Sequence, residues 1–287
     1  MIDYNPRSWW KLIFMFHRSD TLRILLPTMF GVGVFTVLVA YIENEVFHAQ
    51  FKNTTVIHSL VGFVLSLLLV FRTNTAYERW WEGRKLWGSF TNNSRNLALK
   101  IATLVPDATT RNRFRVLISN YILAAREHLR QGVNTNDLAA CDRYPKSYYE
   151  NSRHVPNRVM KAIYTEINDL LQQKVLTQEQ VLFLNAELVS FTDNIGSCER
   201  ILRTPIPYSY SLFLKKVIFL YVLTMPIGFV LEFKYWAAPI VALIFYVFAS
   251  IELLAEEIEE PFGPDANDLP VNAISDNIHD NLVEILG

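Results

Sequence analysis

The densest group of ion-binding side chains lies between residues 255 and 270, where the sequence is AEEIEEPFGPDANDLP. Carboxylate oxygens spaced across a proline–glycine turn can hold calcium, although the spacing is not that of an EF-hand. Neighbouring glutamates also repel one another unless a cation or an arginine compensates them. Two interpretations therefore stay open: a calcium site, or an acidic surface that is solvated or pairs with the arginines of Arg72–Arg84.

No set of residues typical of catalysis accompanies this stretch. HExxH, GxSxG, P-loop and GxGxxG patterns are absent from the sequence, which predicts that the chain is not an enzyme. Cys141 and Cys198 form no CxxC pair and are predicted to be reduced thiols. His58 could titrate at the mouth of a pore or serve as an interfacial polar residue. The other histidines are scattered along the chain: His17, His48, His128, His154 and His279.

Residues 56–71 form an almost entirely apolar run. Phe63, Leu67 and Phe71 recur at helical spacing and line one stripe. The run continues without a proline into RTNTAYERWWEGRKLW. These features predict a membrane helix with one face reserved for something other than lipid. An adjacent stripe of small residues would permit close helix approach: Ser59, Gly62 and Ser66.

Composition agrees with a membrane protein. Of 287 residues, 51% are hydrophobic and only 19% are charged, below the quarter that soluble domains usually carry. A net charge of −1 indicates no nucleic-acid partner. Four transmembrane spans are predicted; the first is too long for the apolar core of a signal peptide. Their approximate ranges are 22–42, 56–71, 212–231 and 236–254.

Charge and aromatic residues predict the orientation of the spans. Arginine and lysine gather before the first span and between the second and third, and are sparse in the other two loops. The positive-inside rule then places both termini and the long middle region in the cytoplasm. The tryptophans lie near predicted span ends, as interfacial anchors do: Trp9, Trp10, Trp80, Trp81, Trp87 and Trp236.

The middle region, about residues 79–203, is predicted to be helical, with breaks at Pro106, Gly132 and Pro145. Thr177 and Gln180 have the spacing of a capping box. We expect one helical unit over residues 1–287, ending in an acidic turn and tail at 255–287, because no separable linker is present. The predicted helices are Leu86–Leu104, Arg111–Arg130, Val155–Gln172 and Thr177–Leu202.

Three motifs resemble the bestrophin family of ion channels, in its bacterial and plant-organelle branch. They are FRTNTAYERWWEGRKLWG, GSCERILRTPIPYSY and LAEEIEEPFGPDANDLP, and the resemblance covers nearly the whole chain in order. It implies an all-α membrane protein with four transmembrane helices per subunit and a helical cytoplasmic region, assembled as a pentamer around a central pore. It also places the protein in the inner (plasma) membrane.

The same resemblance implies roles for particular residues. The hydrophobic neck of the pore falls on Phe63, Leu67 and Phe71. A cytoplasmic aperture falls on Glu179 or Leu182, and the resemblance does not decide between these two residues. The calcium clasp of animal members falls on four acidic positions, but here the aspartate run is broken and bacterial relatives are not thought to be calcium-gated. We expect no required cofactor, with calcium as an optional ligand at Glu257, Glu260, Asp265 and Asp268.

The resemblance therefore implies a passive channel for small anions such as chloride, a homo-oligomer whose other partners are the lipid membrane and the permeant ions. A sodium or potassium channel of the same fold is the alternative, because Glu43, Glu45 and Glu179 could favour cations. A transporter or membrane enzyme would need ionisable residues at mid-depth in the spans, and none is present there.

Overall fold

The computed structural model describes residues 20–47, 54–150 and 152–287, which contain helices and no strand. Their contacts divide the chain into two compact units. The span unit holds the chain up to Arg79 and Pro205–Glu259; the core unit holds Trp80–Thr204 and Glu260–Gly287. The long helix α3 (Thr54–Leu104) contributes its first half to the span unit and its second half to the core unit.

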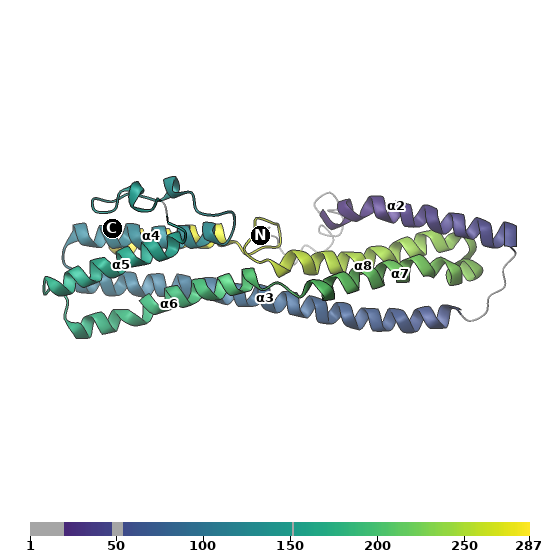
Figure 1. Cartoon of the computed structure of the whole chain (residues 1–287), viewed down its shortest axis with the longest axis horizontal. Coiled ribbons are helices and arrows are strands. Elements are labelled where there is room, and N and C mark those ends of the chain that lie inside the picture. The colour runs from purple at the N-terminus through teal and green to yellow at the C-terminus, as the bar shows by residue number, and fades with distance from the viewer. Residues whose placement is uncertain (1–19, 48–53, 151) are drawn as a thin grey trace. The chain divides into compact units, whose positions relative to one another are not determined.

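The span unit consists of long apolar helices. α2 (Asp20–Tyr41) continues into the π-helical turn η2 (Ile42–Phe47), and it packs on α8 (Ala237–Glu259) and α7 (Tyr208–Phe233). A short 3-10 turn, η5 (Lys234–Trp236), joins α7 to α8, and the two helices lie side by side (Figure 1). Their shared core with α3 is small: Leu65, Leu69, Ile218, Tyr221, Val222, Met225 and Val241.

Among the described residues, three helical segments are long and apolar enough to cross a membrane. They are Thr21–Val46, Val56–Leu104 and Tyr208–Glu259. The third includes both α7 and α8, which were predicted as separate spans. The second runs far beyond the predicted 56–71, because no proline or glycine-rich break interrupts α3 before Leu104.

The core unit is a helical bundle around the second half of α3. α4 (Ala108–His128), α5 (Val155–Gln172) and α6 (Gln178–Arg203) gather with this part of α3 in Figure 1. α9 (Val271–Leu286) packs against α4. Between α4 and α5 lie two short 3-10 turns, η3 (Thr135–Asp137) and η4 (Lys146–Tyr148).

Local signals account for most of these boundaries. Asp107 caps α4 by accepting a hydrogen bond from the Thr110 N–H, and Thr177 and Gln180 form the predicted capping box before α6. α6 ends at Arg203, two residues before Pro205, because a proline disfavours the helical conformation of the residue that precedes it. Cys141 and Cys198 are free thiols, as predicted.

Two sequence-based expectations need revision. Trp87 is not an interfacial anchor: it is fully buried in the core unit, where its ring meets Phe90 edge-on. The predicted C-terminal tail contains the helix α9, which the sequence analysis did not foresee. Trp9 and Trp10 lie outside the described residues.

Candidate functional site

One face of α3 packs inside the span unit. Leu65 and Leu69 are fully buried against α7 and α8. Gly62 lies on the same face, where an added Cβ would come within 2.5 Å of the Tyr221 hydroxyl oxygen. The Ser66 hydroxyl turns back to donate to the Gly62 carbonyl at 2.8 Å. The predicted close helix approach is therefore confirmed at Gly62, where the absence of a side chain admits the tyrosine.

The predicted neck residues lie on the opposite face of α3. Phe63, Leu67 and Phe71 have exposed fractions of 63%, 45% and 63%. With 3.6 residues per turn, this stripe is about half a turn away from Leu65 and Leu69. The three side chains thus form an apolar face that the rest of the described chain leaves open. Their role as a neck stays a prediction.

His58 belongs to the packing face. Its Nε2 lies 3.3 Å from the Thr224 hydroxyl oxygen, and its ring lies near the rings of Tyr221 and Phe229. His58 therefore contacts α7 within the span unit.

A buried ion-pair cluster lies one turn after Leu69 on α3. Arg72 is 1% exposed, and its Nη2 lies 2.7 Å from a carboxylate oxygen of Glu259. The Arg72 Nε lies 3.5 Å from an oxygen of Glu252. The other Glu259 oxygen accepts the Ile206 backbone N–H at 2.7 Å. The predicted pairing of the acidic stretch with the arginines after residue 71 is confirmed for Arg72 and Glu259.

The two aperture candidates lie near the start of α6. Glu179 and Leu182 are both exposed, Leu182 by 72%. Because they are three positions apart on a helix, they share a face. A hydrogen bond with the Thr177 side chain lowers the pKa of Glu179, so this carboxylate is ionised at neutral pH. Both remain candidates for the aperture.

The acidic turn of the core unit is held mainly by an arginine. The Arg130 guanidinium donates to the carbonyls of Phe262 and Gly263, at 2.8 and 3.3 Å, and to the Asn272 side chain at 2.7 Å. Asp268 is buried and accepts the Asp265 N–H at 2.7 Å.

Of the other predicted calcium ligands, Asp265 and Glu260 are exposed, and Glu257 belongs to the span unit. Among the described residues, these carboxylates do not bring three ligand atoms within 4.8 Å of one another. The calcium clasp stays a prediction.

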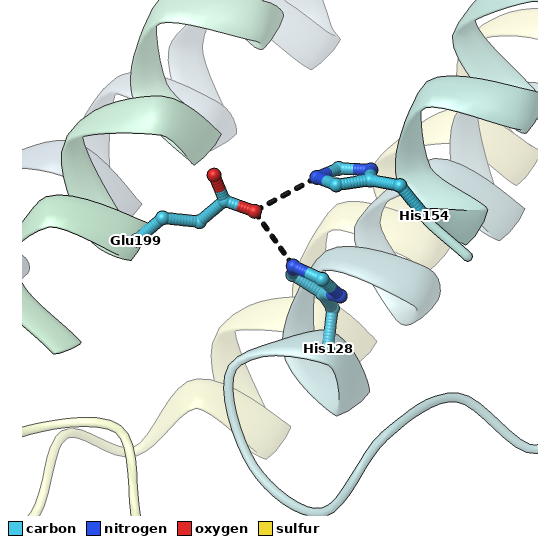
Figure 2. A group of neighbouring side chains, drawn as sticks. All are labelled: His128, His154 and Glu199. Carbon is cyan, nitrogen blue, oxygen red and sulfur yellow. Dashed lines mark hydrogen bonds and ion pairs between the residues drawn. The ribbon is translucent and has the colours of Figure 1, made fainter. Parts of the chain in front are cut away.

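A second polar cluster was missed by the sequence analysis. His128 ends α4, His154 caps α5, and Glu199 lies on α6. Figure 2 shows both rings directed at one carboxylate oxygen of Glu199, with Nε2–Oε1 distances of 2.6 Å for His128 and 2.8 Å for His154. Burial would raise the pKa of Glu199, but the two histidine hydrogen bonds outweigh it and the pKa is lowered.

The long apolar helices and their exposed apolar side chains are typical of a membrane protein. The chain belongs to the bestrophin family, because the family model described as "Bacterial/Fungal Bestrophin protein" matches residues 1–284. This membership confirms the resemblance inferred from the three sequence motifs.

Named relatives cover almost the full chain. A voltage-dependent anion channel-forming protein of Nostoc sp. is 36% identical, covering 97% of this chain and 92% of the relative. Another protein of that name, YneE of Escherichia coli, is 31% identical, covering 99% and 94%. The crystal structure of a bacterial bestrophin homologue from Klebsiella pneumoniae superposes with a TM-score of 0.85 at 26% identity, covering 92% of this chain and 98% of that one.

Proposed function

We propose that the chain is a subunit of a passive anion channel, a homopentamer in which the face of α3 bearing Phe63, Leu67 and Phe71 lines a hydrophobic neck. One observation carries the proposal: this apolar stripe lies opposite the packing face of α3 and stays open in a bestrophin chain. Relatives named as anion channel-forming proteins support the ion class. They also favour a channel over an enzyme.

The stripe suits gating by dewetting. Five copies of two phenylalanines and a leucine would form three apolar rings, one helical turn apart. Such a constriction conducts when it is wide enough to stay wet, and closes to ions when it narrows and loses water. No ionisable group is needed at the neck, and none of the three positions carries one.

We place the channel in the inner membrane with four transmembrane helices, α2, the first part of α3, α7 and α8. The apolar segments of the span unit support this placement. Both termini and the core unit then lie in the cytoplasm. The distribution of arginine and lysine in the sequence supports that orientation.

Flux through liposomes tests the neck. Replacing Phe63, Leu67 and Phe71 together by alanine should widen the constriction and raise chloride flux several-fold. A triple alanine variant on α2 is a matched control, because its residues have the same spacing and are 74%, 44% and 55% exposed: Phe30, Val34 and Leu38. Unchanged flux in the α3 variant, with assembly intact, would show that its stripe faces lipid or a neighbouring subunit.

A cation channel of the same fold is the second candidate, and Glu179 is the observation that favours it. This exposed, ionised carboxylate lies beside Leu182, and five copies would attract cations to a narrow aperture. Reversal potentials under a salt gradient separate the two functions. Glu179→Gln should leave the potential unchanged in an anion channel, and should shift it toward anion permeability in a cation channel.

A further inference from the structure

Two imidazoles and one carboxylate converge in the core unit at the cluster of His128, His154 and Glu199. One possible ligand atom from each lies within 4.8 Å of the other two. The side chains are 18%, 25% and 19% exposed, so they are sheltered but reachable from solvent. Two histidines with one glutamate, and water in the fourth position, are a donor set that proteins use for zinc. We propose that this cluster binds a divalent transition-metal ion such as zinc.

The geometry needs only a small adjustment. Ligand bonds of about 2.0–2.2 Å in a tetrahedral site place the ligand atoms roughly 3.3 Å apart. The two histidine nitrogens now lie 2.6 and 2.8 Å from Glu199 Oε1 (Figure 2). An ion would therefore push these atoms apart by about half an ångström. Side-chain rotation provides this movement, because each ligand comes from a different segment and two lie at helix ends.

The charges around the cluster are compatible with a cation. His128 is the last residue of α4, where the helix dipole favours positive charge. Glu199 supplies a negative charge. Arg203 is the nearby cation, with its Nη2 3.9 Å from Glu199 Oε1. It is 69% exposed, so its guanidinium can turn into solvent when an ion binds.

A competing hydrogen bond lowers the affinity for any metal that binds His154, and the donor set determines which metals still bind. His154 Nδ1 accepts the Asn157 backbone N–H at 3.1 Å, which places the ring proton on Nε2. Binding through Nε2 moves that proton to Nδ1 and breaks this cap, lowering affinity by roughly fivefold to tenfold. Only metals with a strong preference for imidazole overcome this loss. Zinc, copper and nickel fit, whereas calcium and magnesium, which prefer oxygen ligands, do not.

Zinc titration of the purified full-length protein in detergent tests the site. Titration calorimetry should detect binding of zinc but not of calcium. In thermal unfolding, zinc at a hundredfold excess over its Kd should raise the Tm by about 5 °C. Cobalt, used as a spectroscopic probe, should give the visible absorption of a tetrahedral site. Absence of zinc binding and of a cobalt spectrum in the wild-type protein would overturn the proposal.

Variants assign the ion to the cluster. His128→Asn, His154→Asn and Glu199→Gln should each weaken zinc binding at least tenfold and change the cobalt spectrum. His279→Asn is the control, because His279 is an exposed histidine of the same unit that contacts Ser119 instead. Wild-type affinity and an unchanged spectrum in both cluster histidine variants would overturn the proposal, since the ion would then lie elsewhere.

If Glu199→Gln does not fold, a second variant at this position still tests whether Glu199 is a ligand. Glu199→Asp keeps the charge but withdraws the carboxylate by one methylene. It should also weaken zinc binding, and unchanged affinity in this variant would exclude Glu199 as a ligand.

Discussion

The core unit and the span unit place their apolar and charged residues in opposite ways. The core unit buries a cluster of rings in which Phe90, Tyr121 and Phe191 contact one another. The span unit leaves Phe30 74% exposed, yet buries Arg72. Large exposed apolar surfaces are rare on soluble proteins and mark contact with lipid or a partner chain. The contrast indicates that the two units suit different surroundings.

The difference extends to what stabilises each unit. Removal of apolar area from water stabilises the core unit. In lipid that driving force between helices is absent, so close packing and polar contacts replace it. In the span unit these are the Gly62–Tyr221 approach and the ion pairs of Arg72. Four substitutions test this comparison.

The largest effect is expected for Phe191→Ala in the core unit. Phe191 is fully buried and meets the Tyr121 ring edge-on, with ring centroids 5.1 Å apart. Its loss leaves a cavity and should lower the free energy of unfolding by about 3–5 kcal/mol. Denaturant unfolding in detergent measures this. Phe30→Ala in the span unit is the control, with an expected change within about 0.5 kcal/mol; equal losses would contradict the comparison.

Arg72→Met should be the most damaging change to a charge in the span unit. It leaves Glu252 and Glu259 buried without their cation, at a cost of about 3 kcal/mol. Lys215→Met is the control, because the Lys215–Glu256 pair is half-exposed and contributes about 1 kcal/mol or less. Thermal unfolding of both variants measures the difference. A loss for Arg72→Met no greater than that for Lys215→Met would show that the buried pair contributes little.

Gly62→Ala should destabilise the span unit by about 1–2 kcal/mol. The new methyl group would meet the Tyr221 hydroxyl oxygen at 2.5 Å, so the packed tyrosine ring or the helix that carries it must shift. Tyr221→Phe removes that oxygen and should restore most of the loss in the double variant. If thermal unfolding shows that Gly62→Ala leaves the stability unchanged or raises it, helix propensity, which favours alanine over glycine, outweighs packing at this position.

The smallest effect concerns the pH dependence of the core unit. Hydrogen bonds from the Thr110 side chain and backbone lower the pKa of Asp107 below its unfolded value of about 3.9. The stability from this cap is therefore fully present above about pH 4, and is lost as pH falls through the lower folded pKa. Asp107→Asn keeps a cap that does not titrate, so its Tm should fall less than that of the wild type between pH 6 and pH 3. Asp276→Asn, an exposed control on α9, should behave as the wild type does.

Helices were predictable because their signals are local. α5 has the predicted bounds, and the capping box before α6 is present. Periodicity could also have revealed α9, because apolar residues follow Pro270 at helical spacing: Val271, Ile274, Ile278 and Leu282.

Contacts between distant segments were not predictable in the same way. His128 and His154 lie 71 and 45 positions from Glu199, and only the packing of α4, α5 and α6 brings them together. Trp87 shows the same limit. Proximity to a predicted span suggested an interfacial tryptophan, but α3 continues as one helix and carries this side chain into the bundle.

Arg130 has a consequence for how the acidic turn responds to solution conditions. Its guanidinium donates hydrogen bonds to the carbonyls of Phe262 and Gly263 and to the side chain of Asn272. Loops organised by a metal lose their shape when a chelator removes the ion. The cation that organises this turn is the guanidinium of Arg130, which a chelator cannot remove. The conformation of residues 261–270 should therefore persist in calcium-free buffer.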